Sequence, residues 1–367
     1  MNKAPKILFA GGGTGGHLFP AVAVAERVLE KAPESKIVFV GSKSKIEGKV
    51  IPQLGYRFFP IWISGFSRSQ NIKNLLFPVK LVVSLLQSLW LNLTFRPHVA
   101  VGTGGYASGP AVFVAHLLGA RVVLLEQNSY PGITTRLLER YADEIHLSLE
   151  KAKDYLHNKS KIFVSGNPIR KELGKTNRLE AAKKLGIDAD KKTLVVLGGS
   201  LGAKTINQSI CKALDELVAE DIQIVWQTGS NYYERYKSKE SKNIKIIPFI
   251  DSMADVYGVA DVIVSRAGAT TIAEITSLGI ASVLVPSPNV AENHQYHNAI
   301  SLVEKEAALL VEDSNAHESL VVAIKELLNN DELRQKIKNN ATAISFPNAA
   351  TEIAERILKL SNSYPIA

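Results

Sequence analysis

The sequence predicts an α/β protein made of two doubly wound, Rossmann-like domains, each built on a parallel sheet. Short runs of β-branched and other apolar residues alternate with helical patterns along the chain, which is typical of βαβ units and hence of parallel strands. The runs are continuously apolar, which indicates sheets covered by helices on both faces. Glycine-rich turns follow several of the runs, as they do in doubly wound folds.

Eleven segments have the strand pattern, and they form two groups along the chain. Each group predicts one sheet with right-handed crossovers. The first group lies at residues 6–11, 36–41, 98–103, 121–126, 144–148 and 161–166, and the second at residues 193–199, 222–228, 244–249, 261–266 and 281–286.

The two groups are separated by a break at Asn167 and Pro168, after which the chain is polar and rich in lysine. We therefore predict an N-terminal domain at residues 1–166 and a C-terminal domain at residues 167–345. A last helical segment, residues 346–367, is expected to pack back on the first domain. The carboxyl ends of the strands of two such domains would face each other across a cleft.

Composition limits the class of protein. A length of 367 residues and an apolar fraction of 46% suit two packed cores. Cys211 is the only cysteine, which excludes a disulfide framework and favours a reducing, cytoplasmic setting. No apolar segment with a small-residue cleavage site follows the N-terminus, so we expect no signal peptide. The net charge of +8 suits phosphates, an anionic membrane face or nucleic acid, or simply a basic soluble protein.

Residues 71–97 form an apolar segment with two alternative interpretations. Pro78 and Lys80 interrupt it, so it contains no run of about 20 apolar residues that could span a bilayer. The periodicity favours a helix buried in the first domain. The alternative is a partly exposed helix docked on a membrane surface, with Arg68, Lys73 and Lys80 near anionic lipids.

The first glycine loop contains Gly11, Gly13 and Gly16 at the spacing of the dinucleotide fingerprint, between a strand and a helix. Such glycines let backbone N–H groups approach a diphosphate. NAD also requires an acidic residue at the end of the second strand, where this chain has Ser42 and Lys43. NAD is therefore disfavoured, while an NADP-like alternative stays open.

Two further glycine-rich loops follow strands, at residues 102–109 and 198–202. Three such loops in two domains indicate more than one diphosphate-bearing group. The alternative for any single loop is close packing between a strand and a helix.

The second domain has two more polar features after strands. A helix that starts near residues 269–271 can receive a phosphate, and Glu274 one turn later can accept hydrogen bonds from both hydroxyls of a ribose. An ordinary helix start is the alternative. The amide-rich stretch at residues 293–298 suits sugar hydroxyls. His294 and His297 have helical spacing for a metal, but no carboxylate or thiolate completes a site, so we expect no metal.

Seven motifs together resemble one family. They are "GGGTGGHLFPA", "VGTGGYASGP", "EQNSYPG", "SGNPIR", "GGSLGAKTIN", "FIDSMADVYGVADVIVSRAGATTIAE" and "NHQYHNA", and in this order they resemble the MurG family of bacterial lipid II-forming transferases. The resemblance implies the GT-B fold and an inverting hexosyltransferase. Such an enzyme moves N-acetylglucosamine from its uridine diphosphate (UDP) donor to the 4-hydroxyl of the muramoyl-pentapeptide lipid I, without a metal or other cofactor.

The resemblance also implies site residues. As general base it implies His17, with Glu126 as the alternative, and beside them on the acceptor side Gly104, Gly105 and Tyr106. The residues implied for the donor are Thr14, Gly15, Gly16, Asn128, Arg170, Ser200, Ile250, Ala269, Thr270, Thr271, Ile272, Ala273, Glu274 and Gln295. Two positions depart from the family pattern: Leu201 replaces a common Gln, and Leu125 replaces a common His.

A lipid acceptor implies a peripheral protein on the cytoplasmic face of the inner membrane, with cell-wall synthesis or division proteins as further partners and no nucleic acid. The expected docking residues are Leu75, Leu76, Phe77, Lys80 and Trp90. Three alternatives remain: another GT-B transferase or epimerase acting on the same donor, an NAD(P) oxidoreductase, and a non-catalytic membrane scaffold.

Overall fold

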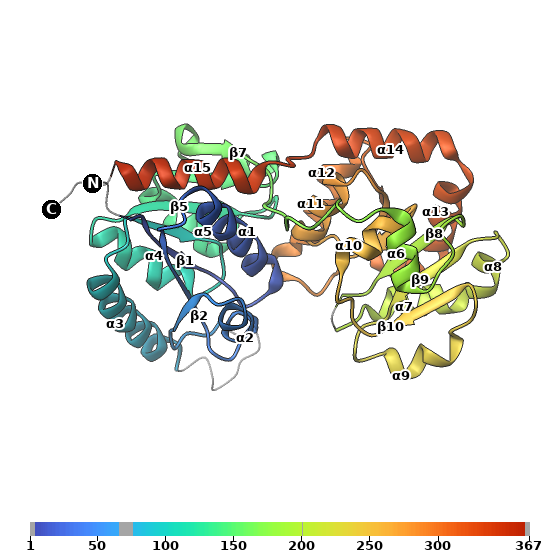
Figure 1. Cartoon of the computed structure of the whole chain (residues 1–367), viewed down its shortest axis with the longest axis horizontal. Helices are drawn as coiled ribbons and strands as arrows, with labels where there is room; N and C mark the ends of the chain where they lie inside the picture. The colour runs from blue at the N-terminus through green and yellow to red at the C-terminus, as the bar shows by residue number, and fades with distance from the viewer. Residues whose placement is uncertain (1–3, 66–75, 200, 364–367) are drawn as a thin grey trace. The chain divides into compact units, whose positions relative to one another are not determined.

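The computed structural model describes residues 4–65, 76–199 and 201–363. The chain divides into two compact units. Unit 1 comprises Met1–Arg170 and Phe346–Ala367, and unit 2 comprises Lys171–Ser345. Each unit has its own parallel sheet covered by helices (Figure 1).

The sheet of unit 1 has seven strands in the order β3-β2-β1-β4-β5-β6-β7, and all neighbours pair in parallel. The strand order reverses between β1 and β4, which makes this the switch point of a doubly wound sheet. The strands are β1 (Lys6–Ala10), β2 (Lys36–Gly41), β3 (Arg57–Pro60), β4 (Val99–Gly102), β5 (Arg121–Glu126), β6 (Glu144–Leu147) and β7 (Ile162–Val164).

The sheet of unit 2 has six parallel strands in the order β10-β9-β8-β11-β12-β13, with its switch point between β8 and β11. The strands are β8 (Thr193–Leu197), β9 (Gln223–Gln227), β10 (Ile244–Ile247), β11 (Val262–Ser265), β12 (Ala281–Leu284) and β13 (Leu309–Leu310). The predicted fold class is confirmed. The sequence prediction missed β3, a short edge strand with a half-exposed pattern, and β13, which has only two residues.

Helices connect the strands in both units. In unit 1 they are α1 (Gly15–Lys31), α2 (Ile46–Gln53), α3 (Phe77–Phe95), α4 (Ser108–Leu117), α5 (Ile133–Leu138) and, from the end of the chain, α15 (Ala349–Asn362). In unit 2 they are α6 (Arg178–Leu185), α7 (Lys204–Lys212), α8 (Leu214–Val218), α9 (Tyr233–Tyr236), α10 (Met253–Val259), α11 (Ala269–Ser277), α12 (His294–Val303), α13 (Ala316–Asn329) and α14 (Asp331–Ala343).

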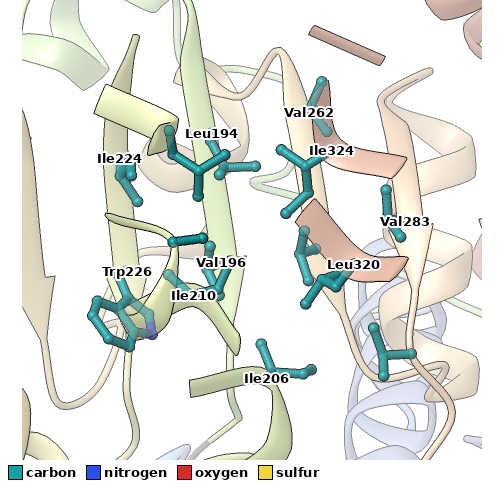
Figure 2. Packing of buried hydrophobic residues seen from close by; sticks show 14 of the residues in the cluster. Leu194, Val196, Ile206, Ile210, Ile224, Trp226, Val262, Val283, Leu320 and Ile324 are labelled. Atoms are coloured by element: carbon teal, nitrogen blue, oxygen red, sulfur yellow. The ribbon is translucent and has the colours of Figure 1, made fainter. Parts of the chain in front are cut away.

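Alternate residues of a central strand enter two different cores, because successive strand side chains point to opposite faces of the sheet. In β1, Ile7 and Phe9 pack with residues of α1 and α15 on one face of the sheet. Leu8 points to the other face and belongs to the core that α3 and α4 cover. Unit 2 repeats the pattern. Figure 2 shows one of its cores, where Trp226 of β9 lies near Ile210 of α7, and Ile324 of α13 lies near Val262 of β11.

The C-terminal helix α15 packs along α1 in unit 1 (Figure 1). Arg356 of α15 donates two hydrogen bonds to the Glu144 carboxylate, at 2.7 and 2.8 Å, and lies 3.5 Å from the centre of the Phe163 ring. The buried His146 contacts the same carboxylate at 3.1 Å. Burial alone would raise the pKa of Glu144, but the hydrogen bonds from His146 and Arg356 outweigh it and hold that pKa below its usual value.

Helix α3 contradicts the buried helix that periodicity favoured and agrees with the alternative of a partly exposed helix. Most of its apolar side chains face outward: Val82, Leu86 and Trp90 are each more than half exposed. Its buried face combines the small polar residues Ser84, Ser88 and Asn92 with the apolar residues Leu91 and Phe95, and it packs on α4. Small polar residues fit at this contact because they let the two helices approach closely. Their side chains donate hydrogen bonds to carbonyls of their own helix, so these donor groups are not buried without a partner. By length and composition alone, α3 could cross a bilayer, and it is the one such helix in the described part of the chain.

Candidate functional site

Two loops of unit 1 meet at its switch point, one after β1 and one after β4. A Cβ atom on Gly105 would lie 2.5 Å from the carbonyl oxygen of Gly12, and one on Gly11 would lie 2.0 Å from Thr103 Oγ1. These distances are too short for any side chain, so the glycines let the two loops pack directly on each other. Close packing, the alternative weighed for a single loop, therefore accounts for these glycines.

A buried carboxylate closes the other side of the first loop. Glu47, in the first turn of α2, accepts hydrogen bonds from the N–H groups of Gly13 at 2.8 Å and Ser42 at 2.9 Å. Its Cδ would lie 2.3 Å from a Cβ on Gly12. The phosphates of a dinucleotide would bind the N–H groups of this loop, where the carboxylate of Glu47 would repel them. This disfavours the NADP-like alternative. The sequence prediction missed Glu47 because it lies beyond the strand end and reaches the loop only in the fold.

His17 follows in the first turn of α1, where a buried amide contacts it. Its Nδ1 lies 3.0 Å from Oε1 of Gln127, whose Nε2 donates a 3.2 Å hydrogen bond to the carbonyl of Leu125. Because that donation turns Oε1 toward the ring, the contact favours the tautomer in which Nδ1 bears the proton and donates. The Nε2 atom of His17 then has a free lone pair for accepting a proton. Gln127 is 2% exposed and was also missed by the sequence prediction.

Glu126 is buried at the end of β5 and binds the loop that follows. Its carboxylate accepts hydrogen bonds from the N–H groups of Asn128 and Gly132, both at 3.0 Å, and from the Asn128 side chain at 3.4 Å. These contacts shape residues 127–132 and orient Asn128. Leu125, one of the departures from the family pattern, is a core residue.

The remaining predicted residues of unit 1 lie near the same loops. A Cβ atom on Gly104 would lie 2.7 Å from His17 Nδ1, so this glycine allows the ring to lie against the backbone. Tyr106 is half exposed and contacts the backbone of Gly65. Thr14 is exposed at the start of α1. Arg170 stacks over the Phe19 ring at 5.6 Å.

In unit 2, the glycine loop after β8 is held by a neutral side chain. The Gly199 N–H donates to Oε1 of Gln227 at 3.1 Å, and the Gly198 N–H donates to the Gln227 carbonyl at 3.0 Å. Gln227 is 6% exposed at the end of β9. The predicted Ser200 lies outside the described residues, and Leu201 beside it is 67% exposed.

The second loop at this switch point follows β11 and leads into α11. The predicted ribose ligand Glu274 is 3% exposed, and the buried Tyr257 of α10 donates a 2.7 Å hydrogen bond to its Oε2. Ala269 to Ala273 form the first turns of α11, and Ile250 is buried after β10. Tyr257 was missed, although it stands in one of the quoted motifs.

The amide-rich stretch begins α12 with a strained backbone. Glu292 and Asn293 have φ of 54° and 50°, in the left-handed region, which asparagine tolerates better than glutamate does. Gln295 accepts a 2.9 Å hydrogen bond from the Ser287 N–H, and Asn298 donates to the Ala267 carbonyl at 3.2 Å. The second bond ties α12 to the loop before α11. Within the described ranges, no group of three or more His, Cys, Asp or Glu side chains could hold a metal.

Known proteins resemble this chain over its full length. Residues 7–147 match the glycosyltransferase family 28 N-terminal domain, and residues 193–357 match the family 28 C-terminal domain. A protein of Flavobacterium psychrophilum is 41% identical, with 98% of each chain covered. The chain belongs to glycosyltransferase family 28. The Flavobacterium protein is named UDP-N-acetylglucosamine--N-acetylmuramyl-(pentapeptide) pyrophosphoryl-undecaprenol N-acetylglucosamine transferase, as is a Thermoanaerobacter sp. protein 40% identical over 98% of this chain and 99% of its own.

Solved structures agree with the family 28 assignment. The crystal structure of Acinetobacter baumannii MurG is 26% identical and covers 97% of this chain and 99% of its own, with a TM-score of 0.74. A putative UDP-N-acetylglucosamine 2-epimerase from Listeria monocytogenes, 16% identical over 95% of this chain and 94% of its own, has a TM-score of 0.67 and shares the fold. The predicted MurG resemblance and GT-B fold are confirmed, and the chain is a glycosyltransferase.

The predicted site residues fall into two groups, one in each unit. His17, Gly104 and Gly105 lie together at the switch point of unit 1. At the switch point of unit 2, α11 with Glu274 is joined to α12 through Asn298. Their roles remain predictions that rest on the resemblance.

Proposed function

We propose that this chain transfers N-acetylglucosamine from UDP-N-acetylglucosamine to muramoyl-pentapeptide pyrophosphoryl-undecaprenol (lipid I), forming lipid II with inversion at the anomeric carbon. The observation that supports this most is near-complete coverage at about 40% identity by relatives named for this transfer. The reaction makes one glycosidic bond in peptidoglycan synthesis.

Unit 2 provides the donor site. Glu274 accepts hydrogen bonds from the ribose hydroxyls, and Tyr257 fixes its carboxylate by donating to Oε2. The N–H groups at the start of α11 and the loop after β8 face the diphosphate, whose negative charge grows as the bond to the sugar breaks. Gln295 binds sugar hydroxyls, and Ile250 contributes its backbone to the uracil.

The chemistry is a displacement at C1 of the donor sugar. The acceptor 4-hydroxyl oxygen forms the new bond to C1, and the old bond to the phosphate oxygen breaks with its electron pair remaining on UDP. The transition state has oxocarbenium character. The hydroxyl must lose its proton as the new bond forms, so a general base is required within hydrogen-bond reach.

His17 is the base that the geometry supports best. Gln127 holds its Nδ1 proton in place, which leaves Nε2 ready to accept the hydroxyl proton. Glu126, the alternative, already accepts hydrogen bonds from two backbone N–H groups. We assign Glu126 to positioning the 127–132 loop, which includes the predicted donor residue Asn128.

Helix α3 provides the membrane contact. Leu76 is 49% exposed, Trp90 is 58% exposed, and further leucines and valines lie along the same outward side. Phe77 is half-buried at the start of the helix, and Lys80 donates a 2.8 Å hydrogen bond to Ser64 Oγ. An interfacial helix of this kind would hold the enzyme on the cytoplasmic face beside its lipid acceptor. Leu75 lies outside the described residues.

A binding screen followed by a transfer assay tests this function. UDP, UDP-N-acetylglucosamine, NAD and NADP are compared by thermal shift, and we expect stabilisation by the uridine ligands alone. The protein is then given UDP-N-acetylglucosamine with a lipid I analogue, and the product is identified by mass spectrometry. Conversion of the donor sugar without acceptor would instead identify an epimerase, and absent transfer with good donor binding would contradict the proposal.

A further inference from the structure

We propose that Arg266 is a positioning residue for recognition of the donor sugar. Its guanidinium fixes the segment that follows β12, and that segment in turn fixes the side-chain amide of Gln295. The inference rests on the proposed function, in which Gln295 binds hydroxyls of N-acetylglucosamine. It adds the part of unit 2 that sets the orientation of this amide.

The Arg266 side chain joins three parts of unit 2. Arg266 directly follows β11, and its Nη1 donates hydrogen bonds to the carbonyls of Val285 at 3.1 Å and Pro286 at 3.2 Å, just after β12. The same nitrogen donates to Oδ1 of Asp313, in the turn before α13. Oδ2 of that carboxylate accepts a 2.9 Å hydrogen bond from Thr205 Oγ1 at the start of α7. Asp313 therefore holds the guanidinium in place against the two carbonyls.

The chemistry of this contact requires an arginine. The side chains of Arg266 and Asp313 are 20% and 19% exposed, so water screens the pair only partly. Val285 and Pro286 are buried, and buried carbonyl oxygens need donors. A planar guanidinium can serve a carboxylate and backbone carbonyls together, which the point charge of a lysine cannot do in the same geometry. Without it, the backbone at residues 285–286 would lose donors that hold it.

The segment that Arg266 fixes leads directly to Gln295. Ser287 follows Pro286, and its N–H donates a 2.9 Å hydrogen bond to Oε1 of Gln295 in the first turn of α12. Because a backbone N–H can only donate, this contact decides which end of the amide is the oxygen. Nε2 is then the end that can donate to a hydroxyl of the sugar. A displaced Ser287 would displace or turn this amide.

A second contact ties α12 to the same place. Asn298, about one turn after Gln295, donates a 3.2 Å hydrogen bond to the carbonyl of Ala267, the neighbour of Arg266. Asn298 and Ala267 are both fully buried. The start of α12 is thus attached twice to residues 266–267, once through Asn298 and once through Arg266 and the segment after β12. Two attachments fix the rotation of the helix as well as its position, and a binding side chain needs both.

Unit 2 contains another arginine–aspartate pair, which provides a matched control. Arg178 donates hydrogen bonds to Oδ2 of Asp261 at 2.9 Å and to the carbonyl of Lys191 at 2.7 Å. Asp261 precedes β11 and Lys191 precedes β8, so this pair lies at the amino ends of the strands. Ligands of doubly wound sheets bind at the carboxyl ends. Loss of Arg178 should therefore lower stability without affecting donor recognition.

The first experiment compares R266M with R178M. The kcat/KM for UDP-N-acetylglucosamine is measured in transfer to a lipid I analogue, and the dissociation constant of UDP is measured by calorimetry. We expect R266M to lower kcat/KM by about tenfold or more, because a displaced amide no longer holds the sugar in the reacting geometry. Its dissociation constant for UDP should change by less than about threefold, since the nucleotide has other contacts. R178M should lower the melting temperature and leave both constants unchanged.

The variant D313N tests the partner of Arg266. It keeps the guanidinium but removes the charge that holds it against the carbonyls of residues 285 and 286. Its kcat/KM should fall between the values of R266M and the unmodified protein, and its binding of UDP should be unchanged. A kcat/KM equal to that of the unmodified protein would remove Asp313 from the assignment.

A double-mutant cycle with Q295M tests whether Arg266 acts through Gln295. The loss of kcat/KM caused by R266M is measured in the unmodified protein and again in the Q295M background. Residues that act through one contact are not additive, so in the Q295M background R266M should lower kcat/KM by less than about threefold. Single-turnover rates with enzyme in excess extend the measurement to slow variants.

Equal losses in the two backgrounds would overturn the inference, because Arg266 would then act independently of Gln295. An equal loss of kcat/KM in R178M would also overturn it, since general destabilisation would explain both variants. The same holds if R266M weakens UDP binding as much as it lowers kcat/KM, because the nucleotide site would then be disturbed. Absent transfer by the unmodified protein would instead remove the proposed function.

Discussion

The two units share one strand order over six strands, with β7 added in unit 1, but they differ in the chemistry at their switch points. In unit 1, an imidazole and two buried carboxylates lie around the glycine loops: His17, Glu47 and Glu126. In unit 2, the corresponding loop is held by the amide of Gln227. The topology therefore decides where each site lies, and the side chains beside the loops decide what it can bind. Under the proposed function, unit 1 provides the general base and unit 2 binds the nucleotide.

The largest effect is expected for H17A, which tests the assignment of the general base to unit 1. If His17 is the general base, kcat should fall by roughly 10²- to 10⁴-fold, the usual contribution of such a group. The dissociation constant for UDP should stay unchanged, because the nucleotide is assigned to unit 2. Single-turnover rates and calorimetry measure the two quantities. Near-normal turnover in H17A would remove His17 as the base.

The reciprocal test is E274Q in unit 2. Losing a charged acceptor for the ribose hydroxyls should raise the dissociation constant of UDP by about 10- to 100-fold, the range for hydrogen bonds to charged groups. The donor with 2′- and 3′-deoxyribose should show a much smaller change. Y257F, which frees the Glu274 carboxylate, serves as a milder companion. Equal losses for ribose and deoxyribose donors would contradict the assignment.

A smaller effect is expected for the residue that orients the general base, which tests whether Gln127 holds the His17 ring. Q127M should lower kcat by about tenfold, since an unguided imidazole spends part of its time in the unproductive tautomer or orientation. The fraction of His17 protonated at Nδ1, measured by ¹⁵N NMR of the resting protein, should fall in parallel. An unchanged tautomer ratio in Q127M would show that Gln127 does not orient the ring.

The membrane contact should belong to unit 1 alone. L76E combined with F77E should reduce co-sedimentation with anionic vesicles several-fold and raise KM for lipid I in vesicles. It should leave transfer to a water-soluble acceptor analogue unaffected. V322E, at an exposed position on α13 of unit 2, is the matched control and should have no effect. Undiminished vesicle binding by the double variant would argue against docking through this end of α3.

The smallest expected effect concerns acid stability. The lowered pKa of Glu144 stabilises unit 1 at pH values above the unfolded carboxyl pKa of about 4.3, and this contribution is lost as pH falls through the lower folded pKa. R356M should cost about 1 kcal/mol at pH 7, and the difference from the unmodified protein should narrow below pH 4. Hydrogen exchange followed by mass spectrometry should locate the loss in β6 and α15. A constant difference across this pH range would contradict the assignment.

Much of the fold was predictable because strand patterns are local. All eleven predicted strands are present, since continuous apolar runs such as residues 193–197 fit only a covered parallel sheet. For α3, the buried helix that periodicity favoured was wrong, and the alternative of a partly exposed helix is the one found. Periodicity locates an apolar face but cannot say whether that face meets the core. Here the face that packs against α4 carries the serines and Asn92 together with Leu91 and Phe95.

The sequence by itself determined the two-sheet α/β class and the family, because glycine spacing and motif order are properties of the chain. Only the tertiary structure decided which side chains support the predicted site residues. Glu47 reaches the first loop from 34 residues away, and Gln127 reaches His17 from 110 residues away. Such contacts arise where parallel strands end side by side at one edge of a sheet. Separation along the chain gives no signal of them.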